Sequence, residues 1–188
     1  MNSLKRREFL KLSGVLGLAT LNTRLATAAE SATSSGTFAG KYFTMFKVLS
    51  HQIIPDTDTP GALACQVPEQ MKAFVLKVYG EQHIADYSRK LDALDNWLKS
   101  NFGESWHSGD DKKHHGIVSA LEDYSYDESP DSEVAAGYRE TKELIVFHYY
   151  TSQQGATKTL HYDPVPGMYK GCEDLSIIGK TWATPNAY

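Results

Sequence analysis

The sequence predicts an all-α protein, a small bundle of about five helices with a long irregular C-terminal tail, occupying residues 41–188. Two observations predict this class. Apolar residues recur at spacings of three and four between residues 41 and 151, which is the period of a helix with one buried face. No segment shows the strong alternation of apolar and polar residues that is typical of a half-buried strand.

Proline and glycine bound the first two predicted helices. The first begins near Lys41 and ends before Pro55, because proline interrupts helical hydrogen bonding. The second opens at Pro68, which a first turn tolerates, and closes at Gly80. Residues 56–62 between them have the composition of turns. The two apolar faces consist of Tyr42, Met45, Phe46, Leu49 and Ile53, and of Met71, Phe74, Val75 and Val78.

Two further helices are predicted at about residues 82–102 and 110–124. Gly103 stops the first of them, and Gly116 weakens the second, because glycine is a poor helix former. A loop is expected over residues 125–131. The apolar faces consist of Ile84, Tyr87, Leu91, Leu94 and Leu98, and of Ile117, Val118 and Leu121.

The fifth predicted helix has the clearest pattern and spans about residues 132–151. Residues 144–147 are apolar nearly all round the helix, which predicts burial between other helices. His148 is expected to be a hydrogen-bonded histidine of the core or of an interface. Residues 156–188 mix glycine, proline and aromatic residues, so we expect an irregular, ordered tail that wraps over the domain or a neighbour.

Residues 1–28 have the three-part layout of a secretory signal: a basic start, a mildly apolar stretch over residues 12–21, and a small-residue cleavage site. The pattern Arg-Arg-x-Phe-Leu-Lys resembles the twin-arginine motif of bacterial proteins that are exported folded. Residues 29–40 are small and polar, as in a flexible leader. We therefore expect passage through the twin-arginine translocase into the periplasm. The export determinants are Arg6, Arg7, Phe9, Leu10 and Ala28.

Charge and cysteine content narrow the classes of partner. Removing residues 1–28 takes away five basic residues and one acidic residue, which moves the formal net charge from −4 to −8. This acidic balance argues against nucleic acid and anionic membranes as partners. In an oxidising compartment, Cys65 and Cys172 can pair with each other, or one or both can bond a partner chain. Both alternatives remain open at this point.

Motifs of catalysis and cofactor binding are absent from the sequence. It contains no glycine-rich dinucleotide fingerprint, no Cys-x-x-Cys-His haem site and no Gly-x-Ser-x-Gly elbow. His114 and His115 point about 100° apart on a helix, which favours a solvated helix start over a shared metal. His51 with the aspartates at 56 and 58 has too few oxygen ligands for a calcium loop. We therefore expect no catalytic, cofactor or metal site in this chain.

Three segments carry a resemblance to a known family. Residues 49–62, 147–155 and 160–172 resemble, in order, the Pro-x-Thr-Asp-Thr-Pro-Gly-Ala loop, the Tyr-Thr-Ser-x-x-Gly segment and the Tyr-x-Pro-x-Pro-Gly-x-Tyr-x-Gly-Cys ending of that family. The family is the small subunit, called subunit 3 or gamma, of membrane-bound gluconate 2-dehydrogenase and related sugar dehydrogenases. The matched positions are Thr59, Pro60, Gly61, Tyr150, Thr151, Ser152, Gly155, Tyr162, Pro166, Gly167, Tyr169 and Cys172.

The resemblance implies a non-catalytic subunit that binds no cofactor itself. Its partner would be an FAD-binding large subunit of the glucose–methanol–choline oxidoreductase class, often joined by a cytochrome c subunit. The small subunit would mature and stabilise that flavoprotein and escort it through the twin-arginine route. The matched positions would either set turns or dock on the flavoprotein, and these two roles are compatible. The match of Cys172 slightly favours a bond to the large subunit over pairing with Cys65.

Two alternatives from other classes stay open on the sequence. One is an independent periplasmic enzyme with an unrecognised cofactor. The other is a periplasmic carbohydrate-binding module that uses exposed aromatic side chains.

Overall fold

A computed structural model describes residues 40–104, 106–130, 132–163, 165, 172 and 174–183. The predicted signal, with Arg6, Arg7, Phe9, Leu10 and Ala28, lies outside the described residues. So do Pro166, Gly167 and Tyr169, and nearly all of the predicted leader. Contacts divide the chain into residues 1–41 and 42–188, and the helices named below belong to the second unit.

The described residues form helices and no strand, so the predicted all-α class is confirmed. An isolated parallel bridge joins His161 to Trp182. The α-helices are α2 (Phe43–Ile53), α3 (Val67–Val78), α4 (Glu81–Phe102), α5 (Asp111–Asp123), α6 (Glu133–Thr151) and the short α7 (Leu175–Ile178). Two π-helical turns, η1 (Tyr124–Glu128) and η2 (Gly155–Thr159), follow α5 and α6. The predicted loop at 125–131 therefore begins as a continuation of α5, and the predicted irregular tail contains η2 and α7.

Local capping explains several helix ends. The carboxylate of Asp110 accepts a hydrogen bond from the Lys113 amide at the start of α5, at 2.9 Å. The hydroxyl of Ser132 accepts one from the Ala135 amide at the start of α6, at 3.1 Å. Both satisfy amides that lack helical partners. Gly103 ends α4 with a φ of +87°, which glycine adopts without steric cost.

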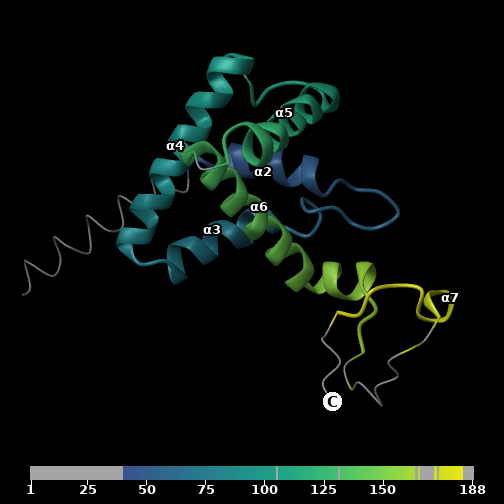
Figure 1. Ribbon diagram of the computed structural model, residues 1–188. Helices are drawn as coiled ribbons and strands as arrows, with labels where there is room; N and C mark the ends of the chain where they lie inside the picture. Colours follow the sequence, from purple (N-terminus) through teal and green to yellow (C-terminus); the bar gives the residue numbers. More distant parts are fainter. Residues whose placement is uncertain are drawn as a thin grey trace, which may run out of the picture. The chain divides into compact units, whose positions relative to one another are not determined.

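Helix α6 is the centre of the bundle. It packs against α4, α3 and α2, and α2 in turn packs against α3 and α5. Figure 1 shows α6 crossing the middle of the bundle, with its C-terminal end continuing toward the tail. The large side chains that are fully buried are Phe46, Leu49, Met71, Tyr87, Leu91, Leu94, Leu98, Ile117, Leu121, Tyr138, Ile145 and Tyr149.

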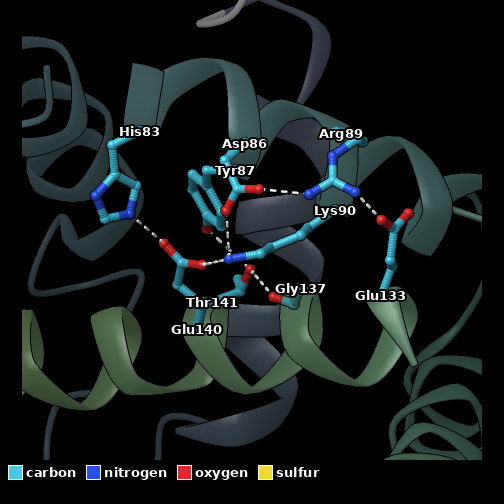
Figure 2. A network of polar contacts seen from close by, with 9 residues as sticks. All are labelled: His83, Asp86, Tyr87, Arg89, Lys90, Glu133, Gly137, Glu140 and Thr141. Carbon is cyan, nitrogen blue, oxygen red and sulfur yellow. Dashed lines mark hydrogen bonds and ion pairs between the residues drawn. The ribbon is translucent and has the colours of Figure 1, made fainter. Parts of the chain in front are cut away.

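A close approach and a polar network join α4 to α6 (Figure 2). A Cβ on Gly137 would lie 2.8 Å from the Lys90 carbonyl oxygen, so only glycine fits at this crossing. The Lys90 ammonium bridges Glu140 at 3.1 Å and Asp86 at 2.7 Å. His83 contacts the other oxygen of Glu140 at 3.0 Å. The two helices are therefore held by charged groups at the rim as well as by the core.

Three expectations about burial are wrong. Val78, assigned to an apolar face, is 61% exposed at the end of α3. Val146 and Phe147 are exposed, because no described element covers the outer side of this half of α6. His114 is buried rather than solvated, since it lies on the side of α5 that also carries Ile117 and Leu121.

Candidate partner-binding surface

The C-terminal half of α6 has one buried face and one exposed face. Ile145, Tyr149 and Ser152 are buried, at spacings of four and three that place them on one side of the helix. Phe147 and Tyr150, also three apart, lie on the other side and are 53% and 41% exposed. One turn of sequence therefore supplies both a structural anchor and an accessible surface.

The buried face holds the turn-rich loop that follows α2. The hydroxyl of Tyr149 donates a hydrogen bond to the Pro60 carbonyl at 2.7 Å and lies 2.8 Å from the hydroxyl of Thr159 in η2. Tyr149 thus joins two of the segments on which the resemblance rests. The sequence reasoning missed this residue and selected Tyr150 instead. The spacing 138, 141, 145, 149 on α6, at which every residue is buried, was the signal that could have identified it.

Gly61 closes the loop where no side chain fits. Its amide donates to the carboxylate of Asp56 at 2.7 Å, and the next amide, of Ala62, donates to the Ile54 carbonyl at 2.9 Å. A Cβ on Gly61 would lie within 2.8 Å of backbone atoms of Ile54, Pro55 and Asp56. The role that the structure shows for Gly61 is therefore to allow this turn.

Ser152 and Gly155 end α6 in a similar way. The Ser152 hydroxyl donates to the Tyr149 carbonyl at 2.7 Å and accepts from the Gly155 amide at 3.0 Å. A Cβ on Gly155 would overlap the Tyr149 carbonyl oxygen. Thr151 is exposed and bonds the Phe147 carbonyl at 2.7 Å, which is an ordinary contact within the helix.

The exposed face of α6, which we call the α6 stripe, consists of Val146, Phe147 and Tyr150. The sequence contains no Asp, Glu, Lys or Arg between Glu143 and Lys158. Exposed apolar and aromatic side chains are typical of the centre of a protein–protein interface. The stripe therefore has the composition of a docking surface.

His148 lies beside the stripe and is 7% exposed. Its ring contacts those of Phe74 and Phe147 edge-to-face, with centroids 5.1 Å apart in both cases. Nε2 is buried and has no hydrogen-bond partner among the described residues, so the expected hydrogen bond at this atom is not found. Burial lowers the pKa of the imidazole below its usual value of 6.5.

A comparison with protein families decides the identity. The family model described as Gluconate 2-dehydrogenase subunit 3 matches residues 41–167. The chain belongs to the gluconate 2-dehydrogenase subunit 3 family. It is therefore the small subunit of a dehydrogenase complex, with a dehydrogenase large subunit as its partner. No curated protein and no solved structure matches the chain.

The family match spans the helices from α2 to α6 and the turn η2, and it includes the α6 stripe and the Pro60–Gly61 loop. The docking roles of Pro60, Gly61, Tyr150, Thr151, Ser152, Gly155 and Tyr162 stay predictions. The structure divides them by position: Gly61, Ser152 and Gly155 are buried, and Tyr150, Thr151 and Tyr162 are exposed.

Cys65 and Cys172 are not paired with each other in the structure, so the internal bridge, one of the two alternatives, is not seen. The bond from Cys172 to the large subunit stays a prediction. Cys65 is buried just before α3, and Cys172 is exposed in the tail.

In the part of the chain that the structure describes, no group of three or more His, Cys, Asp or Glu side chains is arranged to hold a metal ion. None of the described helices is both long enough and apolar enough to cross a membrane.

Proposed function

We propose that this chain is a non-catalytic small subunit that escorts, matures and stabilises an FAD-binding large subunit of the glucose–methanol–choline class. The complex oxidises a sugar or sugar acid, and the two chains cross the inner membrane together, already folded. The FAD and the catalytic groups belong to the large subunit, and a cytochrome c subunit is a further candidate partner.

The α6 stripe is the observation that carries this proposal. Phe147 and Tyr150 expose large apolar surfaces on a helix whose opposite face is fixed to the core. Burying such side chains against a partner contributes about 25 cal/mol per Å² of apolar surface. Because the family places a dehydrogenase large subunit beside this chain, that subunit is the natural cover for the stripe.

The N-terminal sequence supports the escort role. Arg6 and Arg7 belong to a pattern that resembles the twin-arginine motif, whose route carries folded proteins. A signal of this kind on the small subunit serves a folded flavoprotein that has none of its own. The exposed thiol of Cys172 is available for a covalent bond to the large subunit.

Co-purification tests the proposal. The chain is tagged at its C-terminus, isolated from the periplasm of its native host after growth on sugars, and examined by mass and by visible spectrum. We expect a stoichiometric second chain of flavoprotein size with flavin absorption. A colourless chain that is isolated alone would overturn the proposal and favour a carbohydrate-binding module.

Matched variants locate the surface and test the export role. Phe147→Asp with Tyr150→Asp should abolish co-purification, because two charges would be desolvated in the interface. Tyr126→Asp is the control, since Tyr126 is also an aromatic side chain that is about half exposed, on η1. Replacing Arg6 and Arg7 with Lys should leave both chains in the cytoplasm.

A further inference from the structure

Three aromatic rings from two helices meet at the edge of the α6 stripe, and one of them, Phe147, belongs to the stripe. Phe74 of α3 contacts both His148 and Phe147, with ring centroids 5.1 Å and 6.2 Å away. Phe147 and His148 contact each other edge-to-face. Phe147 is half exposed and His148 is buried, so the buried imidazole lies against a ring that is accessible to a partner.

The imidazole brings a polar atom into this apolar cluster without pairing it. Nε2 of His148 is buried and unpartnered among the described residues. Native interiors pair the large majority of their buried polar atoms, because an unpaired one costs free energy. An apolar side chain of similar size would avoid this cost in the free chain.

The surroundings of the cluster define the chemistry of what covers it. The three rings and the α6 stripe carry no charge, and the nearest exposed charges along the helices are Glu143, one turn before Phe147, and Lys77, one turn after Phe74. A complementary surface is therefore apolar opposite the stripe, and it carries a neutral hydrogen-bonding group opposite Nε2 of His148. The dehydrogenase large subunit is the occupant to which the family match points.

We propose that His148 is the polar anchor of this docking surface. When the large subunit covers the α6 stripe, the Phe147 ring turns aside and a neutral hydrogen-bonding group of the large subunit pairs with Nε2 of His148. This inference rests on the proposed function and deepens it. The anchor makes docking specific, because a surface that lacks the group leaves Nε2 unpaired in the buried centre of the interface.

The anchor role predicts effects of opposite sign in the free chain and in the complex. His148→Phe removes an unpaired buried atom from the free chain and a hydrogen bond from the complex. We expect the melting temperature of the isolated small subunit to stay the same or rise. We expect its affinity for the purified flavoprotein large subunit to fall about tenfold.

Two further variants complete the test, in which affinity is measured by calorimetric titration of the two subunits. His148→Gln keeps a neutral hydrogen-bonding group and should recover part of the affinity. His115→Phe makes the same exchange at an exposed histidine of α5 and should change neither quantity.

The outcomes separate this inference from the proposed function. If His148→Phe binds as tightly as the wild type, the anchor role is overturned while the proposed function stands. A loss of thermal stability together with the loss of affinity also overturns it, because a purely structural role acts in this way. If the wild-type chain binds no flavoprotein, the proposed function fails and the anchor role fails with it.

Discussion

Tyr149 donates a hydrogen bond to the carbonyl of Pro60, which lies 89 residues earlier in the chain, at a distance of 2.7 Å. The same hydroxyl lies 2.8 Å from that of Thr159. One side chain of α6 therefore holds the loop after α2 and the turn η2 in place. The next residue, Tyr150, is exposed. Tyr149 therefore stabilises the contact between the loop, α6 and η2, whereas its neighbour Tyr150 contributes to the docking surface.

Tyr149→Phe should destabilise the small subunit by about 1–2 kcal/mol, because the partly buried Pro60 carbonyl loses its donor. The free energy of unfolding is measured by urea denaturation. Tyr150→Phe is the matched control and should stay within about 0.5 kcal/mol of the wild type, since the hydroxyl it removes belongs to an exposed side chain. Equal effects of the two substitutions would contradict the anchoring role of Tyr149.

Gly155→Ala should cost at least about 2 kcal/mol, because the added Cβ overlaps the Tyr149 carbonyl and the backbone must shift. Gly116→Ala should instead stabilise the chain by about 0.5–1 kcal/mol. Gly116 is exposed in the middle of α5, and no heavy atom lies within 4 Å of the added Cβ. Thermal melting distinguishes the two variants. A Gly155→Ala protein as stable as the wild type would contradict the close approach of Gly155 to the Tyr149 carbonyl.

Glu140→Gln should destabilise the chain by about 1 kcal/mol, because Glu140 accepts from both Lys90 and His83 and its side chain is only 18% exposed. Glu133→Gln, which breaks the pair with Arg89, should have almost no effect. That pair is more than half exposed and therefore screened by water. Urea denaturation at low and high salt measures the free energy of unfolding of both variants. Equal losses in the two variants would contradict this prediction.

The stability of the chain should fall as the pH drops below 6.5, in part because of His148. Burial lowers the pKa of this imidazole in the folded state, so the unfolded chain takes up a proton first. Stability from this source is fully present above pH 6.5 and declines as the pH falls toward the folded-state pKa. In His148→Phe this contribution should be absent, as measured by urea denaturation at pH 7.5 and 5.5. An unchanged pH dependence in the variant would show that other groups account for the loss.

The sequence by itself determined the helical class and most helix boundaries. Helical periodicity and local capping set these features, and both depend on residues close together in the chain. Asp110 and Ser132 cap the helices that they precede, and Gly103 ends α4, as local rules require. The order of three short segments also carried enough information to place the chain in its family, which the family model confirms.

Only the tertiary structure decided which apolar residues are covered. Periodicity gives the direction in which a side chain points, but burial requires a neighbouring element on that side. Phe147 and Val78 lack such cover, whereas His114 has it. In the same way, Tyr149 and Tyr150 are adjacent residues of the same type, and the sequence does not distinguish them. The position of the loop at Pro60 makes Tyr149 the buried anchor and leaves Tyr150 on the docking surface.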